Sequence, residues 1–283
     1  MLKKLYEIVE MPNGIKMMSI LPINETGVAE AYCSIRDNPL GHSEGDCGPF
    51  SCNIYKKLGA ENGIKDFEIC CEALVISPRH VITNRLTAIT NKVRVVDKQT
   101  LDGYDIYDEP TAPRADGLIT SSPDVTLFHY AADCAICLFL DPVKKVTGCL
   151  HASWKGSLLG IFEAEIQHFK SEFKSDPKDI IAVLLPSISV EYFEVGTECA
   201  EQFEQAGYGE FIDYSTYDKP HVDLPKVNQK LLLNCGLRQE NVHVIDDLCT
   251  YHDEKLFHSF RRGPITSDGL HLNGMNGYFI HLK

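Results

Sequence analysis

Residues 131–160 read AADCAICLFLDPVKKVTGCLHASWKGSLLG and hold two apolar runs separated by a short polar turn. The first run covers residues 135–141 and is followed by Pro142, and the second covers residues 146–153. Short runs rich in Ile, Leu, Val and Phe, bounded by turn residues, are typical of buried strands. The stretch therefore predicts two strands joined by a turn, with Cys134 before the first and His151 near the end of the second.

Short apolar runs and amphipathic stretches alternate along the rest of the chain. Further strands are predicted at residues 72–78, 92–98, 116–121, 125–132, 179–188, 241–249 and 277–282. Helices are predicted at residues 158–173, 196–207 and 227–236, where apolar residues recur at helical spacing. Strands outnumber helices, and short turns join many of them, which favours an α+β fold of mixed β-sheets layered with helices. We expect a single domain over residues 1–283.

The composition excludes several classes of protein. The chain has 283 residues and a formal net charge of -13, which argues against a nucleic-acid surface because phosphate binding needs clustered Lys and Arg. No apolar run reaches the roughly 18 residues of a membrane span, and the N-terminus lacks the apolar core of a signal peptide. Eleven scattered cysteines, an odd number, suit a reducing compartment, so we expect a cytoplasmic protein.

Cys134 and His151 are predicted to lie near one edge of the sheet, where residues 153–157 begin the next helix. A helix N-terminus offers unpaired N–H groups, and Lys155 adds a full charge beside Gly156, so this is a candidate anion site. The alternative is that Cys134 and His151 are structural, because free cysteine usually packs as a small apolar residue. Cys137 points to the opposite strand face from Cys134 and is predicted to belong to the core.

A second polar stretch, residues 246–263, carries the pair Arg261-Arg262. Either guanidinium can bind a phosphate with two hydrogen bonds, and the alternative is a solvated turn. Cys249 and His252 in the same stretch have metal-ligand spacing, but no partner pair lies nearby in the sequence.

Several segments resemble, in order, the laccase-domain family, also called the multicopper polyphenol oxidase or purine nucleoside phosphorylase family. Residues 131–156 resemble its "ADC…DP…G..HAGWRG" signature. Residues 45–64 resemble the family's Gly-Asp-Asp segment, and residues 115–134 resemble its Asp-Ala-Leu-Val-Thr strand. Residues 185–203 resemble its "GPSI…YEV" motif, residues 221–237 its "HLDL" motif and residues 248–262 its "CT…FFSYRR" motif. The resemblance covers most of the chain, from about residue 41 to 262, and the collinear set is more specific than any single motif.

The resemblance implies one α+β domain and an enzyme that acts on purine nucleosides, by phosphorolysis or by adenosine deamination. An older label for the family is copper-dependent polyphenol oxidation. The family's site is a His-Cys-His set that binds zinc, and it maps Cys134 and His151 onto two of the three metal ligands. The implied partners are a purine nucleoside and phosphate.

The first histidine of that set is missing, because the matching position falls on Ile89 or Thr90. A catalytic zinc needs about three protein ligands, so we expect zinc binding to be weakened and copper to be less suitable still. His80, His129 and His252 are candidate replacements, although His129 is predicted to point away from Cys134 in a regular strand. The family's Arg of "GWRG" is Lys155 here, and a later Gly-Arg reads Ser267-Asp268.

The sequence leaves three functions open: a purine nucleoside phosphorylase-like enzyme, a catalytically degenerate relative that only binds a ligand, and a metal-free Cys/His hydrolase. For the enzyme, the candidate catalytic residues are Asp133, Cys134 and His151. The candidate substrate- and phosphate-binding residues are Lys155, Gly156, Arg261 and Arg262.

Overall fold

The two apolar runs of residues 131–160 form the antiparallel strands β8 (Ala135–Asp141) and β9 (Val146–Ala152) in the computed structural model of the chain. Every residue of both strands is buried. One face of the pair packs against helices and the other against a second sheet, so the runs are apolar throughout instead of alternating. The predicted strand–turn–strand unit is confirmed. The structure describes residues 4–55, 60–86, 90–108, 113–267, 269 and 271–283.

Within the described residues, four strands extend this pair into a six-stranded sheet of order β13-β10-β8-β9-β6-β5. The added strands are β5 (Val93–Val95), β6 (Gly117–Thr120), β10 (Ile181–Leu184) and β13 (Val242–Val244). The sheet is mixed, because β5 runs parallel to β6 and β13 parallel to β10 while the central pairs are antiparallel. All four strands fall inside predicted ranges.

A second sheet, of order β1-β2-β3-β14-β7-β4 in the described chain, packs face to face on the first. Its strands are β1 (Tyr6–Glu10), β2 (Lys16–Ile20), β3 (Ala29–Ser34), β4 (Val81–Ile82), β7 (Thr126–Ala131) and β14 (Asn276–Leu282). Leu127 and Tyr278 of this sheet join Leu138 and Cys149 of the first in one buried apolar layer. A short pair, β11 (Ile212–Asp213) and β12 (His221–Val222), lies apart from both sheets.

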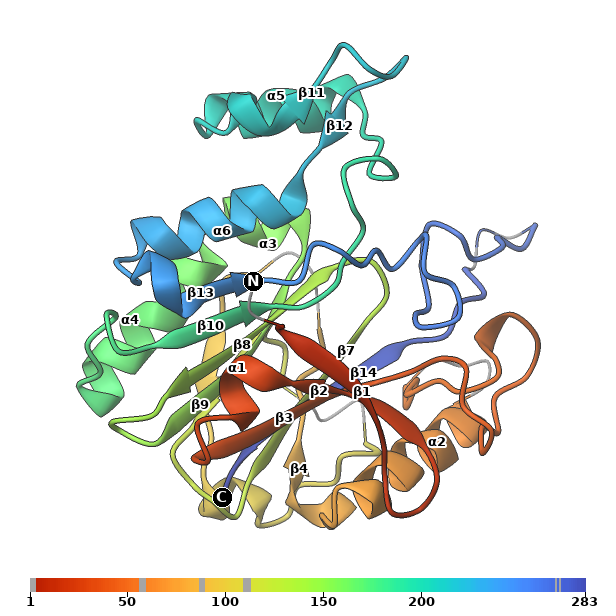
Figure 1. Cartoon of the computed structure of the whole chain (residues 1–283), viewed down its shortest axis with the longest axis vertical. Helices are drawn as coiled ribbons and strands as arrows, with labels where there is room; N and C mark the ends of the chain where they lie inside the picture. Colours follow the sequence, from red (N-terminus) through yellow and green to blue (C-terminus); the bar gives the residue numbers. More distant parts are fainter. Residues whose placement is uncertain (1–3, 56–59, 87–89, 109–112, 268, 270) are drawn as a thin grey trace.

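Six helices lie in the described residues, and α2, α4 and α6 cover the outer faces of the two sheets (Figure 1). The six are α1 (Leu21–Asn24), α2 (Ala60–Ala73), α3 (Trp154–Leu158), α4 (Ile161–Phe173), α5 (Thr197–Gln205) and α6 (Leu224–Asn234). Helices α4 and α6 pack on the first sheet, and α2 packs on the second. The α+β prediction is confirmed, and no helix within the described ranges is long and apolar enough to cross a membrane. The extent of the single domain, residues 1–283, stays a prediction.

Two local predictions are wrong. The helix predicted over residues 158–173, with its entry at residues 153–157, does begin at Trp154, but it is divided at Gly160, whose positive φ of 81° interrupts it. Residues 72–78 were expected to form a strand, but they contain the end of α2 and the loop after it. Ala73 and Leu74 continue the buried side of that helix, where Phe67 and Cys70 pack against the second sheet, whereas Val75 is exposed.

The core between α4 and the first sheet contains a carboxyl group without a partner. Glu165 is fully buried, and neither of its oxygens has a hydrogen-bond partner among the described residues. Its carboxyl group occupies the space beside Gly117 and Gly148, where a β-carbon would lie 2.4 Å and 2.7 Å from its oxygens. Burial raises the pKa of Glu165 well above its ordinary value, so the folded protein holds this group protonated.

Glu165→Gln is expected to make stability less dependent on pH. Above the ordinary glutamate pKa of 4.5, the unfolded chain releases this proton while the folded chain keeps it, so wild-type stability falls as pH rises. The advantage of the variant should grow by roughly 1 kcal/mol per pH unit until the folded pKa is reached. Urea unfolding at several values between about pH 5 and about pH 8 measures it. A difference in unfolding free energy that does not change with pH would contradict the assignment.

Candidate active site

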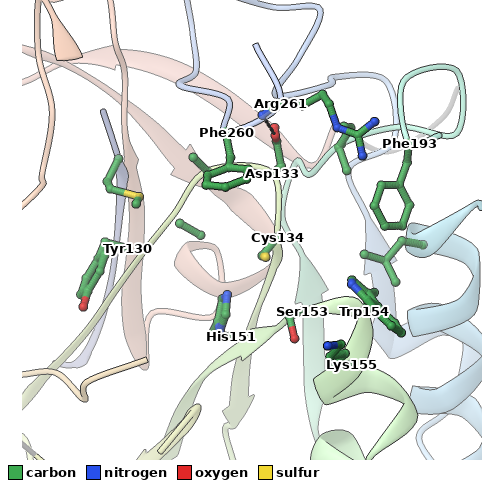
Figure 2. A pocket seen from close by; sticks show the side chains of 15 residues that line it. Tyr130, Asp133, Cys134, His151, Ser153, Trp154, Lys155, Phe193, Phe260 and Arg261 are labelled. Atoms are coloured by element: carbon green, nitrogen blue, oxygen red, sulfur yellow. Dashed lines mark hydrogen bonds between the residues drawn. The ribbon is translucent and has the colours of Figure 1, made fainter. Parts of the chain in front are cut away.

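A cavity of about 520 Å³ lies where β7 ends and β8 begins, beside the start of α3. Its lining includes Cys134, His151, Lys155, Phe260 and Arg261. Figure 2 shows the Cys134 sulfur next to the His151 imidazole near the middle of this cavity. The strand register explains the meeting, because Ala135 pairs with Ala152 and Ile136 pairs with His151. The two residues therefore reach the same end of the hairpin, as the sequence predicted.

Asp116 orients the His151 side chain. The Nδ1 atom of the buried imidazole lies 2.9 Å from Oδ1 of Asp116, and the backbone N–H of His151 donates to the Asp116 carbonyl at 2.8 Å. Because a carboxylate only accepts hydrogen bonds, Nδ1 carries a proton and donates it. Cys134 also hydrogen-bonds the imidazole. The order Asp116, His151, Cys134 forms a chain of polar groups that leads into the cavity.

The surroundings of His151 favour its charged form. Burial alone would lower its pKa, but the interactions with Cys134 and with the Asp116 carboxylate outweigh burial and raise the pKa to about 10. The imidazole therefore holds both protons at neutral pH. A histidine in this state can act as a general acid.

Asp133 lies beside Cys134, but its carboxylate already accepts three hydrogen bonds. Oδ1 accepts from the Thr250 hydroxyl at 2.7 Å, and Oδ2 accepts from the Ser259 hydroxyl at 3.0 Å and from the Arg261 N–H at 2.7 Å. Its φ of 79° is left-handed, a region that Asp and Asn tolerate better than most residues. These contacts join the turn that carries Cys134 to the distant segment of residues 250–261. They indicate a structural role for Asp133, and the catalytic role expected for it stays a prediction.

Two of the four expected phosphate contacts line the cavity as side chains. The exposed Lys155 lies with its Nζ atom 5.2 Å from the centre of the Trp154 ring. The exposed Arg261 also lines the cavity, and its guanidinium donates to the Glu194 carbonyl at 2.9 Å. Both side chains can reach an anion in the cavity.

The other two expected contacts are engaged elsewhere. The N–H of Gly156 donates to the Ser153 hydroxyl at 3.0 Å, which caps the five-residue helix α3. The Arg262 guanidinium does not line the cavity but donates to the carbonyls of Thr250, Tyr251 and Phe257, so it holds that segment together. The cationic groups at the cavity are therefore the side chains of Lys155 and Arg261, whereas the Gly156 N–H at the helix start is already used by Ser153.

The residues present do not fit a catalytic zinc or copper site. Cys134 and His151 provide two donors, and within the described residues no group of three His, Cys, Asp or Glu side chains is placed to hold a metal ion. Of the two positions where the family has its first histidine, Ile89 lies outside the described residues. At the other, the Thr90 hydroxyl accepts from the Lys92 N–H at 3.1 Å. Asp268, another departure from the family, also lies outside the described residues.

None of the candidate replacement histidines joins Cys134 and His151. His129 is fully buried on β7, where its Nε2 meets the Asp116 carbonyl at 3.2 Å. Burial, followed by the charge of His151, lowers the pKa of His129 to about 4, so it stays neutral. His80 is exposed, and the exposed His252 meets Tyr192.

Asp116 is one residue at the site that sequence analysis missed. It lies 35 positions before His151, and only the pairing of Gly117 with Leu150 brings it beside the imidazole. A polar residue directly before a buried strand was the available signal. A sequence pattern could not show which histidine, if any, would form a hydrogen bond with the Asp116 carboxylate.

A sequence profile described as multi-copper polyphenol oxidoreductase laccase matches residues 36–274. The chain belongs to this family. The predicted resemblance is thereby confirmed over most of the chain. As a laccase-family member, the chain departs from the family name at the site itself, where the described donors do not form a copper centre.

Relatives of this laccase-family chain carry the name purine nucleoside phosphorylase. The protein from Bacteroides thetaiotaomicron is 29% identical over 246 residues, which cover 85% of this chain and 88% of the relative. Mouse purine nucleoside phosphorylase LACC1 is 36% identical over 172 residues, covering 59% of this chain but only 38% of the longer mouse protein. YlmD from Bacillus subtilis is 31% identical over 182 residues, covering 63% and 62% of the two chains.

Solved structures share the fold. YfiH from Bacillus licheniformis superimposes with a TM-score of 0.84 at 24% identity, covering 99% of this chain and all of that one. YlmD from Geobacillus stearothermophilus superimposes with a TM-score of 0.78 at 20% identity, covering 94% and 96% of the two chains. At these sequence identities the structural similarity establishes the fold but not the activity, which has to be inferred from the residues of the site.

Proposed function

We propose that the chain is a purine nucleoside phosphorylase that works through Cys134 and His151. One observation carries the proposal: the hydrogen-bonded pair lies in a cavity that also holds two cationic side chains and several aromatic ones. Lys155 and Arg261 suit phosphate, and the aromatic side chains suit a purine base. The names of the relatives support the same reaction class.

In the proposed phosphorolysis, every proton that is transferred can be supplied and taken up by groups at the site. A phosphate oxygen forms a bond to C1′ of the ribose while the C1′–N9 bond breaks, and the bonding electron pair leaves with the base. The His151 imidazolium gives the base its proton, and the proton of the phosphate hydroxyl then restores the imidazolium. Cys134 hydrogen-bonds the imidazole and holds it in position for this proton transfer. No step needs an oxidant or a metal ion.

The basic test incubates the purified chain with inosine or adenosine, with and without phosphate, and measures free base and ribose 1-phosphate. We expect both products only when phosphate is present, and we expect them to form equally after treatment with a chelator. Base release without phosphate would indicate hydrolysis. Release of no base at high enzyme concentration would contradict the proposal and leave the chain as a relative that only binds its ligand.

Lys155→Met and Arg261→Met are each expected to raise the KM for phosphate by about 10-fold or more, because each removes a charged hydrogen-bond donor from the phosphate. The KM for the nucleoside should change little. Initial rates at varied phosphate concentration measure the effect. Lys144→Met, at an exposed lysine in the β8–β9 turn, is the control and should match the wild type. Unchanged phosphate KM values in both cavity variants would contradict this phosphate site.

The chain Asp116–His151–Cys134 also favours a second candidate, a thiol hydrolase. Cys134 would attack an acyl carbon, His151 would protonate the leaving group, and water would then release the acyl product. Alkylation of Cys134 by iodoacetamide at neutral pH, with loss of activity on an activated ester, would support it. A Cys134 that stays unmodified would exclude it.

A further inference from the structure

The cavity has aromatic side chains on two sides, and they differ in how much of each ring is available. Its aromatic lining residues are Tyr130, Trp154, Phe193 and Phe260. Figure 2 shows Phe193, Trp154, Lys155 and Arg261 on one side of Cys134, and Tyr130 and Phe260 on the other. The two cations therefore share a side with Phe193 and Trp154.

The rings of Trp154 and Tyr130 are already engaged. The Lys155 ammonium lies over the Trp154 ring, and Phe203 packs against the same indole with ring centres 6.2 Å apart. Tyr130 meets Tyr55 edge to face at 5.7 Å and also packs near Phe128. Both rings are therefore in contact with neighbouring side chains on part of their surface.

Phe260 differs from both, because it is a large apolar side chain that remains 45% exposed at the rim of the cavity. One face of its ring stacks on His271, with centres 3.6 Å apart and planes inclined by 17°. The stack fixes the ring and leaves the opposite face available. A ring that stacks on a neighbour with one face and is exposed at the other is suited to stacking with a heterocyclic base.

The backbone on both sides of Phe260 is tied to the catalytic turn. The hydroxyl of Ser259 and the N–H of Arg261 both donate to Oδ2 of Asp133, the residue next to Cys134. The position of the Phe260 ring relative to Cys134 and His151 is therefore set by direct hydrogen bonds.

We propose that Phe260, supported by His271, is the platform on which the purine ring of the nucleoside stacks. The inference rests on the proposed function for the identity of the ligand. It places the base on the Phe260 side of Cys134 and the phosphate on the Lys155 side, with the ribose between them beside His151. Phe260 is thus a binding residue and takes no part in proton transfer.

Trp154 provides a direct test of binding that does not depend on turnover. It is the single tryptophan of the chain and lines the same cavity, so its fluorescence reports occupancy when inosine or hypoxanthine is titrated. Phe260→Ala should raise the Kd of both ligands by the same factor, about 5- to 100-fold, because both lose the same stacking contact. Phe260→Tyr keeps the ring and should stay close to wild type. The KM for phosphate should be unchanged in both variants.

Phe193→Ala is the matched variant on the opposite side of the cavity and should affect the hypoxanthine Kd less than Phe260→Ala does. The reverse order would overturn the proposal, as would a wild-type chain that binds neither ligand at millimolar concentration. Binding that depends on Phe260 without any release of base would sustain the platform and refute phosphorolysis. Because the side chain is half exposed, Phe260→Ala should keep the wild-type unfolding midpoint, which shows that a weaker Kd is not caused by misfolding.

Discussion

Replacing His151 with asparagine is expected to lower kcat for purine release by about 10²- to 10⁴-fold, the usual contribution of a general acid. The asparagine amide can still donate to Asp116, so the local hydrogen bond at 2.9 Å has a substitute. What is lost is the proton that the leaving base requires. Single-turnover rates with saturating inosine and phosphate measure the step directly, and the nucleoside Kd from Trp154 fluorescence should change little.

Two further variants make this result specific. His80→Asn changes an exposed histidine and should keep full activity. Asp116→Asn keeps His151 but removes the carboxylate charge that helps to raise the pKa of the imidazole, so activity should fall at alkaline pH before it falls at neutral pH. Wild-type rates in His151→Asn would show that the base leaves without this acid, and the mechanism would then be wrong.

Asp133→Ala is expected to lower the free energy of unfolding by roughly 3–5 kcal/mol. The carboxylate accepts three hydrogen bonds, and each bond to a charged group contributes about 1.5–3 kcal/mol with incomplete additivity. The alanine would also have to adopt the left-handed backbone at a φ of 79°. Equilibrium unfolding in urea measures the loss.

Asp133→Asn separates this structural role from a catalytic one. Asparagine tolerates the left-handed backbone, and its single oxygen can replace Oδ2 and accept from Ser259 and from the Arg261 N–H while its amide donates to the Thr250 hydroxyl, so most stability should return. Because Asp133 holds the segment that carries Phe260, this variant should also keep nucleoside binding and activity. A fully folded Asp133→Asn protein without activity would instead support the catalytic role that the sequence first suggested.

The sequence predicted the hairpin around residues 131–160 well because its signals are local. Apolar residues fill β8 and β9, and turn residues separate them, so the meeting of Cys134 and His151 at one end follows from pairing alone. The boundary of α3 and α4 was missed because Gly160 interrupts a pattern that apolar spacing continues. The strand expected at residues 72–78 was wrong because a short apolar run also fits the buried side of a helix.

The site residues also fall into those that local sequence predicts and those that only long-range contacts define. Cys134, His151 and Lys155 were predicted to lie together because they belong to one supersecondary unit, and all three line the same cavity. Arg261 and Arg262 are adjacent, yet one lines the cavity and the other holds backbone carbonyls, and sequence does not tell such neighbours apart. Asp116 and Phe260 were missed because their roles depend on contacts across long stretches of chain.

The sequence by itself determined the membership of the laccase family, the central strands and the Cys–His pair, because motifs and apolar periodicity are properties of neighbouring residues. Only the tertiary structure showed that Asp116 contacts His151, that Asp133 accepts hydrogen bonds from a distant segment, and that the Phe260 ring stacks on His271 at the rim of the cavity. Those roles arise where segments tens to more than a hundred residues apart are packed together. Hydrogen bonds and ring contacts of that kind depend on positions in space that no local pattern encodes.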